Sequence, residues 1–327
     1  MVTSPRIVFG VFSATQQGAT VTQLARTLAP HLVVVHHDFQ KKADFEVSGS
    51  NVRLIPDPRD TGWGAWGFSQ AIFHTLDYCL DNFEFDYFHL MSPTCLPIRP
   101  LAEFEARVRS AEHDVHADLF PVERDDDTLM TFGYRTYLPG SSLRYRTLMR
   151  ARQWYFGSEA PLLQTSSLSV LALPEARRNR PPLRMRAGLG LTRLASRGWL
   201  GPNPFGPDFR PMIGSTWIGM TREVVQYVSN KQRDPRVRRF FRHLKIVDES
   251  LFPTLLGNSP FRIGHANHAI NDFTAAGNPR WIDDQDYERL AASGRYFARK
   301  FPDDPTAAVR LRAIRRIGID LREPQAA

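Results

Sequence analysis

The first third of the chain alternates apolar runs with a segment of helical periodicity, and this alternation constrains the fold more than any other feature. Four runs rich in β-branched and aromatic residues predict strands at residues 6–12, 32–35, 52–55 and 87–91. From Phe68 onward, apolar residues recur with the spacing of one helix face, and Thr20 is expected to cap an earlier helix that continues to Leu28. This order predicts an α/β fold with a mixed central sheet and helices packed on its faces.

Length and composition narrow the class of protein. A chain of 327 residues, 42% hydrophobic and 23% charged, can bury a sizeable core and lacks the composition of a disordered chain. Its two cysteines, Cys79 and Cys95, lie in apolar runs, which excludes a disulfide framework or a cysteine-based zinc site. No apolar run approaches the roughly 18 residues of a membrane-spanning helix, so we expect a soluble, cytoplasmic protein.

Positive charge is concentrated in the middle of the sequence. The formal net charge is +8, and residues 135–197 contain twelve arginines but only two acids. This excess predicts an anionic partner, and peripheral contact with the anionic inner face of a membrane is one such expectation. Because no periodicity persists between residues 117 and 211, and Pro and Gly gather at 198–211, we expect this segment to be an irregular basic insertion of long loops.

Regular structure is predicted again beyond the insertion. Residues 214–220 are a strand candidate, and helices are expected at residues 221–228, 236–244 and 248–256. A basic helix with a narrow apolar side is expected within residues 305–317. Because that apolar side is small, we expect the helix to dock on the domain rather than on a membrane.

Two Asp-x-Asp pairs match the bare pattern of a divalent-cation site. Asp125 and Asp127 lie in a polar linker, and Asp284 and Asp286 lie in a loop. A working pair should follow directly on a buried strand, and neither pair does. We therefore interpret both as solvated acidic segments and expect no metal site.

Two adjacent carboxylates, Asp248 and Glu249, open an apolar helix. The helix N-terminus and the neighbouring charge can give the two groups different pKa values, so that one serves as a general base. Acids are also frequent in the first turn of helices for structural reasons alone, and this motif by itself leaves both interpretations open.

The segment SGRYFARKF, residues 293–301, places Arg295, Arg299 and Lys300 among three aromatic residues. Aromatic packing can hold these cations in fixed positions, where they would stabilise a departing diphosphate without a metal. A solvated basic face over an aromatic core is the alternative interpretation.

Five blocks of sequence stand in an order that resembles the family of core-2/I-branching N-acetylglucosaminyltransferases and peptide O-xylosyltransferases. They are VVVHHDFQKK, TGWGAWGFSQAIFHTLDYCL with FDYFHLMSPTCLPIRPL, GSTWIGMTREVVQYV, VDESLFPTLLGNS and PRWIDDQDYERLAASGRYFARKF. The resemblance covers most of residues 7–110 and 212–303. It implies a GT-A-type glycosyltransferase that inverts the anomeric carbon and takes its sugar from a UDP-sugar, with no metal or other cofactor.

The resemblance also implies catalytic roles. Glu249, next to Asp248, matches the family's catalytic base, which takes a proton from the acceptor hydroxyl. Arg299 and Lys300 match the basic residues that hold the UDP diphosphate in place of a metal ion.

Further residues are implied to bind the substrates. Asp38, Trp63 and Gly64 would line the uridine side, while Ser215 and Trp217 would lie near the sugar and the acceptor. The implied organisation is a single domain over residues 1–327, composed of a nucleotide-binding half (5–116), a variable Arg-rich insertion (117–211), an acceptor and catalytic half (212–303) and a C-terminal helix and tail (304–327).

The sequence departs from the family pattern in several places. Where the family reads L-S-G-x-D-x-P, this chain reads LMSPTCLP, so Cys95 replaces an acid, and Gly67 stands at the serine of W-G-x-x-S. The membrane anchor, stem and many cysteines of animal members are missing, which favours a compact bacterial-type member. The Arg-rich insertion has no counterpart, although such variable loops usually determine the acceptor.

The expected partners are a UDP-sugar and a glycan acceptor, the latter free or lipid-linked. The sequence does not distinguish between UDP-N-acetylglucosamine and UDP-xylose as the donor, and it does not determine the oligomeric state. One alternative is a non-catalytic relative that binds nucleotide-sugars or glycans, which the retained Glu249 and Lys300 argue against. A nucleic-acid binder is the other, but no nucleic-acid-binding motif is present, so we expect no nucleic-acid partner.

Overall fold

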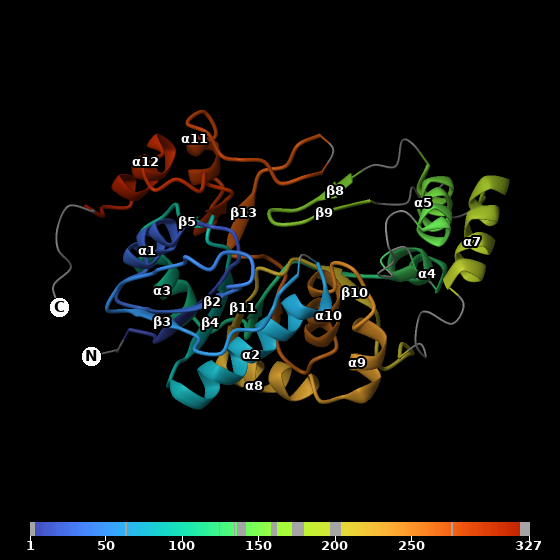
Figure 1. Cartoon of the computed structure of the whole chain (residues 1–327), viewed down its shortest axis with the longest axis horizontal. Helices are drawn as coiled ribbons and strands as arrows, with labels where there is room; N and C mark the ends of the chain where they lie inside the picture. Colours follow the sequence, from blue (N-terminus) through green and yellow to red (C-terminus); the bar gives the residue numbers. More distant parts are fainter. Residues whose placement is uncertain are drawn as a thin grey trace.

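The fold is built around a mixed sheet of seven strands, which confirms the predicted α/β class (Figure 1). The strand order is β12-β6-β11-β4-β1-β2-β3. The computed structural model describes residues 4–62, 64–123, 125–133, 135, 142–157, 162–171, 180–196, 204–275 and 277–320.

Most strands of the central sheet have their carboxyl ends at the same edge. Its members are β1 (Ile7–Ser13), β2 (Leu32–His37), β3 (Val52–Leu54), β4 (Tyr87–Met91), β6 (Val115–His116), β11 (Gly219–Thr221) and β12 (Ile263–Gly264). Strand β11 runs antiparallel to its neighbours β4 and β6, and the other pairings are parallel. The carboxyl ends of β1, β2, β4 and β6 therefore share an edge with the residues that precede β11.

Alternation along the strands supplies a core on each face of the sheet. Within β1, Val8 and Phe12 join one apolar cluster, whereas Ile7, Phe9 and Val11 join the other. The first cluster packs against α2 (Trp66–Asn82), α8 (Arg222–Lys231), α9 (Pro235–Phe241) and α10 (Asp248–Gly257). The second packs against α1 (Gly18–Thr27), α3 (Leu101–Arg109), α11 (Tyr287–Ala291) and α12 (Ala308–Arg316).

The C-terminal helix docks on the body, as expected. Val309 and Ile314 of α12 are buried in the second cluster. The Arg310 side chain is fully buried, and its Nε donates to Gln23 Oε1 at 2.7 Å. This polar contact fixes α12 against α1 and satisfies a guanidinium that would otherwise be costly to bury.

Two smaller sheets contain strands that adjoin the blocks of sequence predicted to form the site. One has the order β13-β14-β5 and contains β5 (Leu96–Pro97), β13 (Ala269–Asn271) and β14 (Phe297–Arg299). The other pairs β7 (Leu119–Pro121) with β10 (Met212–Gly214).

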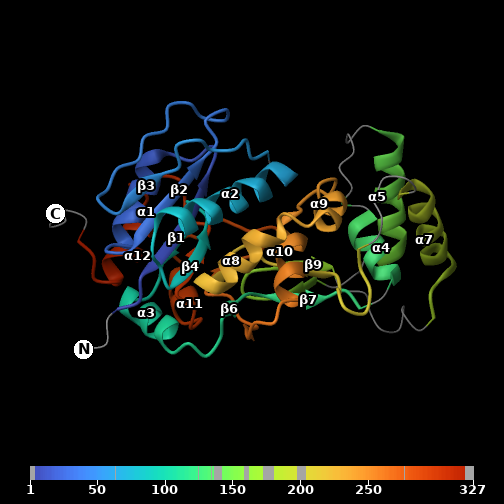
Figure 2. The same cartoon turned by 90° about the horizontal axis from the view of Figure 1, so that it is seen from below.

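The Arg-rich segment is not the irregular run of loops that we expected. Its described part contains α4 (Asp125–Gly133), α5 (Leu143–Phe156), a hairpin of β8 (Leu162–Gln164) and β9 (Ser169–Leu171), and α7 (Leu183–Ser196). The three helices, here called the helical cluster, lie at one end of the molecule (Figure 2). They share a small core of Met130, Tyr155, Met185 and Leu189. Arginines between the buried positions obscured this helical spacing in the sequence.

Two local predictions also need correction. Residues 214–220 do not form one strand, because β10 ends at Gly214 and β11 begins at Gly219. Thr20 does not cap α1; it is buried inside the helix, which begins at Gly18. A Cβ at Gly18 would lie 1.8 Å from the Glu46 carbonyl oxygen, so the close backbone approach at the first residue of α1 requires glycine.

Candidate functional site

Polar groups gather where the parallel strands end. The Asp38 backbone N–H, just after β2, donates to the carbonyl of Ser13, the last residue of β1, at 3.0 Å. Asp118 follows β6, and Ile218, just before β11, accepts from the Leu90 N–H of β4 at 2.9 Å. This edge is where open α/β sheets commonly bind ligands.

The loop of residues 215–217 has three separate anchors at this edge. The Ser215 N–H donates to the Asp118 carbonyl at 3.2 Å, and the Ser215 hydroxyl accepts from Asn267 Nδ2 at 3.3 Å. The Thr216 hydroxyl donates to the Asp248 carboxylate at the start of α10. These bonds orient the loop and explain why the GS-x-W block breaks the strand that we predicted there.

Trp217 links this loop to the FARKF block. The Arg299 guanidinium carbon lies 4.6 Å from the centre of the Trp217 ring, within the range of a cation–π contact. The structure thus brings together Ser215, Trp217, Asp248 and Arg299, four residues that the sequence assigned to one site.

Glu249 is held by an arginine that sequence reasoning missed. Arg135 Nη2 lies 3.3 Å from Glu249 Oε2, and the arginine side chain is only 7% exposed, whereas that of Glu249 is 34% exposed. The two residues are 114 positions apart, and Arg135 belongs to the Arg-rich segment. Its place among twelve arginines gave no signal that it would reach the predicted base.

Arg135 also holds the turn that precedes α10. Its carbonyl accepts from the Lys245 N–H, and its Nη1 donates to the Ile246 carbonyl at 3.1 Å. Ile246 has φ +54°, an uncommon conformation for a β-branched residue, and its N–H donates to the Gly64 carbonyl at 2.6 Å. Contacts on both sides of Ile246 thus fix a strained turn just before the two carboxylates.

The two carboxylates have raised pKa values. Burial raises the pKa of Glu249 to about 7; Arg135 opposes this rise, and Asp248 adds to it. Burial also raises the pKa of Asp248, against the hydrogen bond from Thr216. A carboxylate that titrates near neutral pH and faces solvent in part has the properties of a general base.

Arg299 supplies positive charge close enough to lower the pKa of Glu249, and Lys300 follows it in the chain. Burial lowers the pKa of Arg299, while Cys95 and Glu249 oppose that change. Among the described residues, no hydrogen-bond acceptor meets the buried Arg299 Nε. Burial and the Arg299 charge lower the pKa of Lys300, whose Nζ lies 5.4 Å from the centre of the Trp281 ring. Cys95, which replaces the family's acid, is buried near Arg299, and burial raises the pKa of its thiol.

The residues predicted for the uridine side are only partly described. Asp38 accepts from the Thr61 N–H and hydroxyl at 2.9 and 2.7 Å. Burial would raise the pKa of Asp38, but the hydrogen bonds from Thr61 and Gln40 outweigh it and lower the pKa. Gly64 lies against Ile246 with φ +62°, and Trp63 is outside the described residues. The position of Asp38 at the sheet edge is compatible with its predicted role.

The described residues contain no group of three potential ligands that would hold a metal ion. Asp286 forms an ion pair with Arg280, and Asp127 accepts from the Tyr155 hydroxyl at the start of the helical cluster. The side chain of Asp125 is outside the described residues. Also, no helix in the described ranges is long and apolar enough to cross a membrane.

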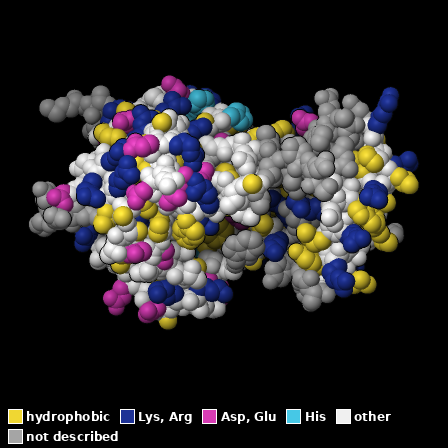
Figure 3. All heavy atoms as spheres, turned by 90° about the horizontal axis from the view of Figure 1, so that it is seen from above, with side chains coloured by type: hydrophobic (Ala, Val, Ile, Leu, Met, Phe, Trp, Pro, Cys, Tyr) yellow, Lys and Arg dark blue, Asp and Glu magenta, His cyan; other side chains and the backbone are white. Residues whose placement is uncertain are grey.

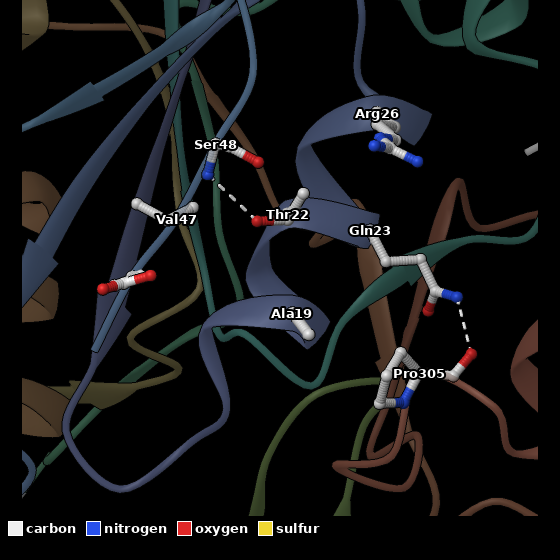
Figure 4. Close-up of a pocket in the computed structure, with 8 residues that line it drawn as sticks. Ala19, Thr22, Gln23, Arg26, Val47, Ser48 and Pro305 are labelled. Atoms are coloured by element: carbon white, nitrogen blue, oxygen red, sulfur yellow. Dashed lines mark hydrogen bonds between the residues drawn. The ribbon is translucent and has the colours of Figure 1, made fainter. Parts of the chain in front are cut away.

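A cavity of about 510 Å³ lies elsewhere, on the outer side of α1 (Figure 4). Its lining includes Thr22, Gln23, Arg26 and Ser48. Two hydrogen bonds shape it: Ser48 N–H donates to the Thr22 hydroxyl at 3.1 Å, and Gln23 Nε2 donates to the Pro305 carbonyl at 2.8 Å. None of the residues predicted for the site lines this cavity.

The fold and site define an α/β protein in which a carboxylate and cations meet at the carboxyl edge of a mixed sheet. Residues 181–300, which contain most of these groups, match the model of the Branch family, described as core-2/I-branching enzyme. The match confirms the family resemblance for this part of the chain and includes Ser215, Trp217, Glu249 and the Arg299–Lys300 pair. The family is one of glycosyltransferases.

No curated protein matches the sequence. Among solved structures, the chain is similar to A197 from STIV, with 14% identity, a TM-score of 0.20, and coverage of 37% of this chain and 53% of that one. The chain thus spans about half the length of that relative. It is also similar to the galactosyltransferase LgtC in complex with donor and acceptor sugar analogues, with 10% identity, a TM-score of 0.38, and coverage of 97% and 98%. Both TM-scores are below 0.5, so neither likeness supports a conclusion about this protein.

Proposed function

We propose that the protein is an inverting GT-A-type glycosyltransferase that transfers N-acetylglucosamine or xylose from a UDP-sugar to a hydroxyl of a glycan. The observation that carries the proposal is the placement of Glu249 beside Arg299 in a segment that matches the core-2/I-branching family. A base with a pKa near 7 and a fixed cation are the two groups that such a transfer requires.

In the proposed step, the acceptor hydroxyl transfers its proton to the Glu249 carboxylate as its oxygen attacks the anomeric carbon. The bond between that carbon and the UDP oxygen breaks, and its electron pair leaves with the diphosphate. Arg299 and Lys300 neutralise the leaving diphosphate, so the step needs no metal ion. Trp217, already in contact with Arg299, offers an aromatic face to a sugar ring.

Arg135 has a positioning role in this proposal. Its guanidinium fixes the orientation of the Glu249 carboxylate and favours the ionised form, which is the form that accepts a proton. Burial alone would leave more of the base protonated at neutral pH. The arginine therefore keeps the base active in an environment that otherwise disfavours its charge.

The substitution Glu249→Gln tests the assignment of the base. It removes the proton acceptor and keeps the shape, so transfer should fall by about 10²–10⁴-fold while stabilisation by UDP in a thermal-shift assay stays the same. The assay uses a panel of UDP-sugars with EDTA present, and reads free UDP and acceptor modification. Glu223→Gln, an exposed acid in the first turn of α8, is the matched control and should leave turnover unchanged.

Each contrary result has a distinct meaning. Full activity in Glu249→Gln would reject this residue as the base. Turnover that requires added Mn²⁺ or Mg²⁺ would reject the metal-free mechanism. UDP binding without transfer to any acceptor would favour a non-catalytic relative, and no stabilisation by any UDP compound would reject the donor class.

A further inference from the structure

The two long helices of the helical cluster carry one sign of charge only. Helix α5 contains four arginines, α7 contains three, and neither contains an acidic residue. Helices α9 and α12 of the body are also free of acids, but Arg312 and Arg316 of α12 pair with the Glu288 carboxylate of α11. Neither α5 nor α7 thus supplies a carboxylate of its own to its arginines.

These helices also expose leucine side chains. Leu143 of α5 is 77% exposed, and Leu183 and Leu194 of α7 are 80% and 68% exposed. They are the three most exposed large hydrophobic side chains in the ranges that the structure describes. Single exposed leucines are common on protein surfaces, but these three lie on two helices that pack against each other and add apolar area to a basic surface.

Arginines stand next to these leucines on the outward sides of both helices. Arg146 and Arg150 of α5 are exposed, as are Arg184 and Arg186 of α7, and none has a carboxylate partner among the described residues. The opposite sides are buried: Gly188 of α7 packs against the Ala151 carbonyl of α5. In Figure 3, hydrophobic and basic side chains are interspersed over the helical cluster, at the right of the view.

We propose that this surface binds an anionic lipid bilayer. The Arg–Leu face, as we name it, consists of Leu143, Arg146, Arg150, Leu183, Arg184, Arg186 and Leu194. Guanidinium groups pair with lipid phosphates, and neighbouring leucines enter the boundary between headgroups and acyl chains. Nucleic acid would satisfy the arginines but would leave the leucines in water, so a bilayer fits the whole face better.

Partition of the purified full chain onto lipid vesicles tests the proposal. The protein should sediment with vesicles of phosphatidylcholine and phosphatidylglycerol, less so at high salt, and not with phosphatidylcholine alone. The double variant Arg184→Ala/Arg186→Ala should weaken this partition about tenfold or more, since each arginine near an anionic surface contributes roughly 1 kcal/mol. Leu183→Ser/Leu194→Ser should weaken it as well, without removing charge.

The matched control is Arg236→Ala/Arg239→Ala on α9, which removes the same charge from exposed arginines of the body. It should change the partition by less than about twofold, because the long-range attraction falls only slightly. Every substituted side chain is exposed, so we expect all variants to fold. Their melting temperatures check this.

Three results would overturn the proposal. One is absence of binding to anionic vesicles, and another is an equal loss of binding in the control and in the arginine variant. The third is binding to random oligonucleotides that competes with vesicles and ignores the leucine substitutions. The inference does not depend on the proposed transfer reaction, so activity on a soluble acceptor can fail or succeed independently.

Discussion

The body of the protein and the helical cluster are stabilised in different ways. In the body, two apolar clusters cover both faces of a seven-stranded sheet, and their residues come from almost every strand and helix. In the helical cluster, the described core centres on Met130, Tyr155, Met185 and Leu189, and Leu148 and Ala151 of α5 are also buried. The body thus has its own large core, whereas the cluster combines a small core with a surface of arginine and leucine.

The two regions also contribute different residues to the proposed site. The body contributes Glu249, Trp217 and Arg299 from rigid elements at the sheet edge. The segment that leads into α5 contributes Arg135, which contacts Glu249 from outside the central sheet. Under the proposed function, the body would position the base, and a side chain of the Arg-rich segment would adjust its pKa.

The largest expected effect of breaking this connection comes from Arg135→Ala. Loss of the cation should raise the pKa of Glu249 above about 7, so transfer at neutral pH should fall by about 10–100-fold. The acid limb of the rate profile, which rises as the base ionises, should move to higher pH. Steady-state assays across pH measure both effects.

Two variants make the Arg135 result specific. Arg135→Lys keeps the charge, so it should recover part of the transfer rate and return the pH dependence of that rate close to that of the unsubstituted protein. Arg150→Ala, an exposed arginine of α5, should leave both unchanged with a soluble acceptor. An unshifted profile in Arg135→Ala would mean that the arginine acts only on the shape of the turn.

Acid should destabilise the body and spare the cluster. Burial lowers the pKa of His36 and His116 to about 4 and that of His89 to about 3, and all three lie in strands of the body. Unfolding returns these groups to about 6.5, so the unfolded state binds more protons below that pH. The free energy of unfolding should fall by roughly 2–3 kcal/mol for each of these histidines as the pH drops from about 6.5 to 4.

The helical cluster offers an internal control for this pH effect, because residues 117–211 contain no histidine. Hydrogen exchange at several pH values, corrected for the intrinsic rates, should show loss of protection in β1, β2 and β4 but not in α5 and α7. Equal loss in both regions would assign acid sensitivity to carboxylates rather than to the buried histidines.

The smallest expected effect comes from glycines of α7. A Cβ at Gly188 would lie 2.7 Å from the Ala151 carbonyl oxygen, whereas one at Gly190 would meet nothing within 4 Å. Gly188→Ala should therefore destabilise the cluster by about 1–3 kcal/mol, and Gly190→Ala should stabilise it by about 0.5–1 kcal/mol. Hydrogen exchange in α5 and α7 measures both, and effects of the same sign would contradict the packing described here.

Much of the body was predictable from the sequence. Strand β4 falls exactly at residues 87–91, and α2, α8 and α10 begin within two residues of their predicted starts. These elements bury continuous or periodic apolar residues, so pattern and structure coincide. The placement of Asp248 and Glu249 at the start of α10 follows from the same periodicity.

What sequence reasoning missed depends on contacts between distant residues. The pairing of Arg135 with Glu249, and that of Thr216 with Asp248, join segments separated by 114 and 32 positions. The cluster was missed because arginines stand between its buried residues, although Leu148, Ala151 and Tyr155 do have helical spacing. That spacing was the available signal, and the surrounding charge obscured it.

The hydrogen bonds of Asp118 connect the Arg-rich segment to the loop of residues 215–217. Its carboxylate accepts from the Thr165 hydroxyl at 2.8 Å and from the Ser167 hydroxyl, both in the hairpin between α5 and α7, and its carbonyl accepts from Ser215. A replacement for this segment would keep the side-chain bonds of Asp118 only if it restored these hydroxyls, and the contact with Glu249 only if it placed an arginine at position 135. A few polar side chains therefore join the segment to the body.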